Sequence, residues 1–103
     1  MISVSDNTRR RIEALFAEAE WKRVTDCLLN GCGDNLPLVD ESYQELTERI
    51  RFAVLKLSNG NLEQLVTQVE SAAIDWRDTL VAAGFADDAK AHLAWEPDAD
   101  NRT

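Results

Sequence analysis

Two amphipathic patterns on either side of a short turn signal constrain the fold of this chain more than any other feature. The first pattern places four apolar residues on one helical face, at i, i+4, i+8 and i+11: Leu46, Ile50, Val54 and Leu57. The stretch SNGN at 58–61 then offers Gly60 as a left-handed helix end and Asn61 as the N-cap of the next helix. Because so short a turn makes the flanking helices antiparallel neighbours, the pattern predicts a hairpin of about 40–58 and 61–83 as the core of the fold.

The ends of this hairpin also carry helix signals. Asp40 is placed to cap the first helix, and Ser42 with Glu45 has the spacing of a capping box. The second helix ends at Gly84, a typical left-handed terminal residue, and Phe85 is the apolar residue that follows it. One face of the second helix is expected to be apolar through Leu62, Leu65, Val66, Val69, Ala73, Trp76 and Leu80. The core of the hairpin is expected to include Ile50, Val54, Leu65, Val69 and Trp76.

Residues 8–30 have helical spacing but two apolar sets on opposite sides, Ile12, Leu15, Phe16 and Ala19 on one and Trp21, Val24 and Leu28 on the other. A straight helix would bury only one set. We therefore expect a break near 16–20, between a helix from about Thr8 and a second helix that ends at about Asn30. A continuous helix with partners on both sides is the alternative.

The remaining chain adds one short element. A last helix is expected to start at Asp87 and to end before Pro97. No alternating run of β-branched and aromatic residues predicts a strand. The sequence thus predicts an all-α fold, a small bundle of four to five helices in a single domain over 1–96, followed by a polar tail at 97–103.

Charge and hydropathy limit the partners. Nineteen acidic against eleven basic residues leave a net charge of −8, which argues against nucleic acid because each phosphate contact needs a Lys or Arg. No segment has the apolar length of a membrane span, and the N-terminus has no apolar run after its basic cluster. We expect a cytoplasmic protein with no membrane partner.

Two cysteines, Cys27 and Cys32, flank a glycine in the stretch CLLNGCGDNLP. A structural zinc site needs four ligands, and the chain adds one histidine, His92, far along the sequence. We expect structural thiols, one in the core and one at a helix end, with no metal or cofactor; redox or disulfide use is the alternative.

Other groups that could carry chemistry are few. His92, in the stretch DAKAHLAW, is expected to be a partly exposed residue of a short helix rather than a catalytic base. Asp75 and Asp78 in DWRD lie at i and i+3, where paired carboxylates can do acid–base work. A solvated face with Arg77 as a local charge partner is the simpler interpretation.

Three apolar residues are candidates for binding a partner. Trp95 lies near the C-terminus, where it either covers the end of the bundle or stays exposed as an anchor. Phe52 and Leu55 lie off the apolar stripe of their helix, which widens its apolar surface. They are partner-binding candidates, unless this helix is central and has neighbours on several sides.

The segments CGDNLP, RIRFAVLKLSNGN and DWRDTLVAAGF together resemble a group of short hypothetical bacterial proteins that have these segments in the same order. The resemblance covers about Cys32 to Trp95. It implies a bacterial origin, and it carries neither an activity nor a site residue.

These patterns favour a non-enzymatic module that binds another protein or a second copy of itself. The alternative is a small-ligand binder or enzyme that uses the acidic loop 31–41, although that loop has no phosphate-binding glycine pattern and no nucleophile–base pair. Regulators, antitoxin-like partners and DNA mimics remain further classes that an acidic surface permits.

Overall fold

The computed structural model describes residues 4–31, 43–86 and 91–95, and within these ranges the fold is all-α, as predicted. The helices are α1 (Asp6–Leu15), η1 (a 3-10 turn, Glu18–Glu20), α2 (Trp21–Gly31), α3 (Tyr43–Ser58), α4 (Leu62–Ala83) and α5 (Ala91–Ala94). None of the helices in the described part of the chain is both long enough and apolar enough to cross a membrane. The predicted caps at Asp40 and Ser42 and the polar tail lie outside the described residues.

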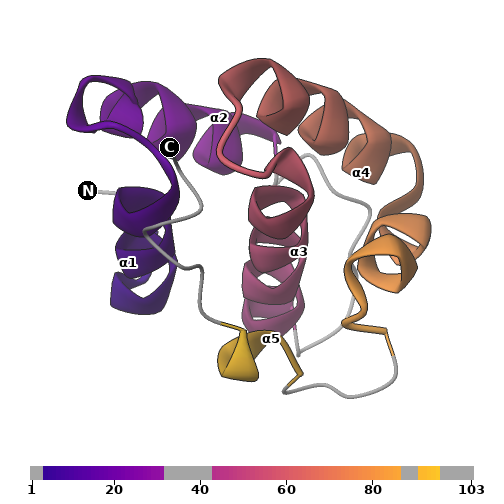
Figure 1. Cartoon of the computed structure of the whole chain (residues 1–103). Helices are drawn as coiled ribbons and strands as arrows, with labels where there is room; N and C mark the ends of the chain where they lie inside the picture. Colours follow the sequence, from indigo (N-terminus) through magenta and orange to yellow (C-terminus); the bar gives the residue numbers. More distant parts are fainter. Residues whose placement is uncertain (1–3, 32–42, 87–90, 96–103) are drawn as a thin grey trace.

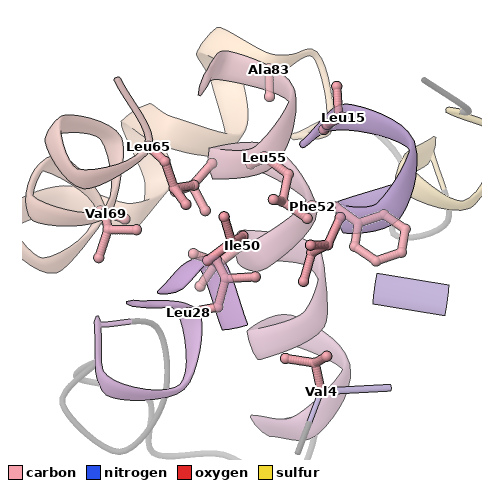
Figure 2. Close-up of a cluster of buried hydrophobic side chains, with 14 of the residues drawn as sticks. Val4, Leu15, Leu28, Ile50, Phe52, Leu55, Leu65, Val69 and Ala83 are labelled. Atoms are coloured by element: carbon pink, nitrogen blue, oxygen red, sulfur yellow. The ribbon is translucent and has the colours of Figure 1, made fainter. Parts of the chain in front are cut away.

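Helix α3 lies in the middle of the structure, with α1 and α4 on either side of it and α5 near its N-terminal end (Figure 1). Helix α2 packs against α1 and α4. Apolar side chains from α1, α2, α3 and α4 meet around α3 (Figure 2). Four of the five predicted core residues are buried there: Ile50, Val54, Leu65 and Val69.

The predicted break between the first two helices is confirmed. Helix α1 ends at Leu15, Phe16 has an extended backbone, and η1 leads into α2. The indole Nε1 of Trp21 donates a hydrogen bond of 2.8 Å to the carbonyl of Phe16, which stabilises the turn between the two helices. Because the chain turns here, Phe16 and Val24 are both buried.

The first helix begins two residues before the predicted start. Ser5 has an extended backbone and its Oγ accepts a hydrogen bond of 3.1 Å from the Thr8 amide, which is an N-cap. The same hydroxyl donates to the carboxylate of Glu48 on α3. The cap therefore also ties the start of α1 to the central helix.

The turn signals predicted for the hairpin are confirmed. Helix α3 ends at Ser58, Asn59 and Gly60 both have positive φ, and the Asn61 side chain accepts from the Gln64 amide at 3.0 Å. At the other end of α4, Gly84 has φ 82°, and the Phe85 amide donates to the Leu80 carbonyl at 2.9 Å. This is a Schellman-type helix end with Phe85 as its buried apolar residue.

Helix α4 is not the straight partner that its apolar pattern predicts. Asp75 has φ −152° and ψ 91°, so the helix bends sharply there and the Asp75 carboxylate accepts from the Arg77 amide, as a cap for the second half. The end of α4 contacts α3, because Lys56 in the last turn of α3 donates a hydrogen bond to the Ala83 carbonyl.

The buried residues of α4 differ from those predicted. Ala72, Thr79 and Ala83 are buried, whereas Val66 and Ala73, expected on the inner face, are exposed. Trp76, beside the bend, is only half-buried and packs against the edge of the core. The expectation that Trp76 lies within the core was wrong, because it assumed an unbroken helix and α4 bends at the preceding residue, Asp75.

Two glycines allow close packing between helices. A Cβ on Gly31, the last residue of α2, would overlap Cγ1 of Val69 on α4. A Cβ on Gly60 would lie 2.8 Å from the Leu15 carbonyl oxygen at the end of α1. The first contact brings α2 against α4, and the second brings α1 against the hairpin turn.

Candidate functional site

Four aromatic rings form a cluster at the end of the structure where α5 packs on α3. The rings of Phe52 and His92 meet edge to face with centroids 4.8 Å apart, and Trp95 lies 6.3 Å from Phe52. Phe85, just after α4, lies 6.3 Å from His92 and 6.2 Å from Trp95. The cluster joins α3, the end of α4 and α5.

A buried arginine of α1 holds this cluster from the other side. Arg11 is 1% exposed, and its Cζ lies 4.4 Å from the centroid of the Phe52 ring. Its Nε donates to the Trp95 carbonyl at 3.1 Å and its Nη2 to the Leu93 carbonyl at 3.3 Å. These carbonyls are at the C-terminal end of α5, where the partial negative charge of the helix end attracts the positively charged guanidinium.

No role was predicted for Arg11 from the sequence, where it belongs to the basic run Arg9–Arg11. A signal was present, because Arg11 lies at i+3 from Thr8 and at i−4 from Leu15, on the face of α1 that is buried. A long cationic side chain at a core position of an amphipathic helix indicates a buried partner for the charge.

Two basic residues of α3 bind the other end of the cluster. Arg49 Nε donates to the Phe85 carbonyl at 3.0 Å, and its Nη2 donates to the Ala86 carbonyl at 3.2 Å. Lys56 Nζ donates to the Ala83 carbonyl at 2.8 Å and lies 5.0 Å from the centroid of the Phe85 ring. These contacts satisfy the terminal carbonyls of α4 and hold its bent second half on α3.

The structure does not leave the predicted partner-binding residues exposed as anchors. Phe52 and Leu55 are fully buried, because α3 has neighbours on several sides (Figure 2). Trp95 is half-buried and covers the aromatic cluster, with its carbonyl bound by Arg11. In the folded chain, Phe52 and Leu55 are core residues and Trp95 closes one end of the core.

His92 was expected to be a partly exposed surface residue, and this expectation was wrong. The ring is 5% exposed and lies between Phe52 and Phe85. Helix α5 is so short that its place in the fold depends on contacts with other helices, which a local pattern does not show. The structure makes His92 part of the aromatic packing.

Of the two cysteines, only Cys27 lies within the described residues. This thiol is half-buried on α2, and burial, together with the nearby negative charge of Glu70, raises its pKa. Cys32 and nearly all of the acidic loop 31–41 lie outside the described residues. In the ranges that are described, no group of three or more His, Cys, Asp and Glu residues is arranged to hold a metal ion.

The acidic pair of α4 lies at the bend of the helix. Asp75 and Asp78 are both exposed, and the Asp75 carboxylate accepts the Arg77 amide. The guanidinium of Arg77 lies over the Trp76 ring, 5.2 Å from its centroid. Asp75 therefore acts in the helix bend, as a cap.

The exposed apolar residues identify a different surface from the one predicted. Among the described residues, the large apolar side chains with most exposure are Val66 (41%), Ile74 (87%), Val81 (66%) and Leu93 (42%). Three of the four belong to α4, and we call Val66, Ile74 and Val81 the outer surface of α4. The sequence pattern did not separate Ile74 and Val81 from core residues.

Comparison with protein-family models, with curated proteins and with solved structures gave no match for this chain. The geometry of the described residues is therefore the basis for a functional proposal. Its two distinctive regions are the closed aromatic cluster and the outer surface of α4.

Proposed function

We propose that this protein is a non-enzymatic interaction module that binds another protein through the outer surface of α4. The observation that carries this proposal is the exposure of Ile74, a large apolar residue of α4 that is 87% accessible. Burying an isoleucine side chain is worth about 1.5–3 kcal/mol, and the folded chain leaves that free energy unused at this position.

The position of these residues on α4 supports the proposal. Ile74 lies nine residues after the buried Leu65, which is half a helical turn from it at 100° per residue. In the second half of the helix, Val81 lies about 160° around the helix from the buried Thr79 and Ala83. Both side chains thus point away from α3, so a partner reaches them without opening the core.

The titratable groups in the described part of the chain also favour binding over catalysis. His92 is enclosed by aromatic rings, and burial raises the pKa of the Cys27 thiol, which lowers the fraction of reactive thiolate. Asp75 is used as a helix cap. These roles belong to packing and local structure.

The test is a positional cross-linking experiment in cells of the native host. A photoreactive amino acid at position 74 is compared with the same residue at position 18, because Glu18 is also exposed but lies on η1. We expect a discrete protein adduct from position 74 and none from position 18. No adduct at position 74, or the same adducts from both positions, would overturn the proposal.

The mass of the pure protein separates the two kinds of partner. A single chain has a mass of 11.6 kDa, which is the value expected from sedimentation equilibrium for a monomer. A larger mass that returns to one chain in Ile74→Gln would show that a second copy uses this surface. A single-chain mass together with a cross-linked adduct would identify a different protein as the partner.

A further inference from the structure

We infer that the segment received by the outer surface of α4 is a basic amphipathic helix of another protein. This inference rests on the proposed function and adds the chemical class of the partner. It is carried by the combination of exposed apolar side chains and exposed acidic side chains on one helix.

The apolar part of the surface has the dimensions of a helix–helix contact. Val66 and Ile74 are eight residues apart on the first half of α4, so they are separated by about 12 Å along the axis, at about 1.5 Å per residue. A partner helix that lies along them presents apolar side chains about two turns apart, at i and i+7 or i+8. Val81 lies beyond the bend at Asp75 and limits the length of a straight partner.

The charges beside these residues are mostly negative. Helix α4 carries four acidic residues and one basic residue: Glu63, Glu70, Asp75, Asp78 and Arg77. Glu63, Glu70 and Asp78 are exposed, and none of them forms an ion pair with another residue of the described ranges. Lys or Arg residues that flank the apolar stripe of a partner helix would meet these carboxylates.

A second copy of this chain is a poor occupant of the same surface. Two α4 helices facing each other would bring their acidic residues together, in a chain that already has a net charge of −8. The single basic residue of α4, Arg77, lies over the ring of Trp76. Like charges placed across an interface cost free energy, so charge selects a basic partner over self-association.

The experiment uses two synthetic peptides of about 18 residues, roughly five helical turns, with leucines on one helical face. One peptide has lysines on the other face and the second has glutamates in their place. Each is titrated into the full-length protein by isothermal calorimetry at low and at physiological salt. We expect saturable binding of one Leu/Lys peptide per chain, weaker at higher salt, and no binding of the Leu/Glu peptide.

Matched variants localise the binding. Ile74→Gln should weaken the Leu/Lys peptide about tenfold or more, whereas Leu93→Gln, which alters an exposed apolar residue of α5, should leave the affinity unchanged. Glu70→Gln, which removes the exposed charge between Val66 and Ile74, should weaken binding, and Glu18→Gln, which removes an exposed charge outside α4, should not. All four substituted side chains are exposed, so each variant is expected to fold, and circular dichroism checks this.

Different results would contradict different parts of the inference. Equal losses in Ile74→Gln and Leu93→Gln, or no Leu/Lys binding, would overturn the proposed contact with a basic helix. Equal affinity for both peptides would overturn its charge preference. In either case an adduct from position 74 that is absent from position 18 would leave the proposed function standing, whereas the loss of that adduct would remove the proposed function itself.

Discussion

The guanidinium of Arg11 in α1 lies over the ring of Phe52 in α3, with Cζ 4.4 Å from the ring centroid. The same guanidinium donates hydrogen bonds to the carbonyls of Leu93 and Trp95. One side chain thus links the first helix, the central helix and the last helix. The position of α5 depends on this link, because a four-residue helix has too few internal hydrogen bonds to be stable alone.

Replacement of Arg11 should therefore loosen the end of the chain. Arg11→Met keeps much of the apolar stem but removes the donors to three carbonyls, those of Asn7, Leu93 and Trp95. It should lower the free energy of unfolding by about 1.5–3 kcal/mol. Hydrogen exchange at the Trp95 amide, which donates to the His92 carbonyl, should become faster. Urea denaturation and exchange measured by mass spectrometry give the two values.

The control for this change is Arg9→Met in the same helix. Arg9 is exposed and lies 3.8 Å from the Asp6 carboxylate, so its loss should change the free energy of unfolding by no more than about 0.5 kcal/mol. Similar effects of the two substitutions would contradict the role given to Arg11.

The close approach of α2 and α4 predicts a coupling between Gly31 and Val69. Gly31→Ala places a methyl group where Cγ1 of Val69 lies, and it should destabilise the fold by about 1–3 kcal/mol despite the better helix propensity of alanine. In a Val69→Ala background that Cγ atom is absent, so the same substitution should cost much less. A double-mutant cycle by urea denaturation measures the coupling, and additive effects would mean that the two helices are not in contact at Gly31.

Gly60 and Gly84 provide a matched pair with nearly the same backbone conformation. Their φ values are 79° and 82°, but a Cβ on Gly60 would lie 2.8 Å from the Leu15 carbonyl oxygen, while one on Gly84 would meet only Lys56 Nζ at 3.9 Å. Gly84→Ala should cost about 1 kcal/mol for the left-handed backbone. Gly60→Ala should cost about 1–2 kcal/mol more, because a backbone atom must move. Equal values from thermal or urea unfolding would show that the contact with α1 is loose.

The aromatic residues should differ in their contributions to stability. Phe52 is fully buried, so Phe52→Ala should cost about 3–5 kcal/mol. Trp76 is half-buried at the bend of α4, and Trp76→Ala should cost less, about 1–3 kcal/mol. Chemical denaturation followed by circular dichroism ranks the two variants, and a larger effect at Trp76 would contradict the burial described here.

The thiol of Cys27 should react slowly with alkylating reagents. Burial and the negative charge of Glu70 raise its pKa, so at pH 8 it has less of the reactive thiolate than an exposed cysteine. In a Cys32→Ser background, the rate of iodoacetamide modification should still be rising with pH above pH 9. Glu70→Gln should increase the rate at pH 8, but only in part, because burial is the larger cause and remains. An unchanged rate in Glu70→Gln would rule out the electrostatic contribution.

The local signals of the sequence determined the helical class, the turn between α3 and α4 and the left-handed end at Gly84. Each of these depends on residues within one or two helical turns of each other, such as Asn61 and the Gln64 amide. The break after Leu15 was also predictable, because two apolar sets on opposite sides of one helix cannot both face a single core.

The tertiary structure alone decided which polar and apolar residues are buried. Arg11 and His92 are enclosed by residues that are distant in the sequence; Trp95, which binds Arg11, is 84 positions away from it. A short-range sequence pattern cannot predict such partners. In the first half of α4 the side that faces the core carries Leu65 and leaves Val66 exposed, and the bend at Asp75 leaves Trp76 at the edge of the core. Burial depends on the shape of the neighbouring helix as well as on periodicity. The packing of α4 against α3 therefore determines which α4 residues form its outer surface.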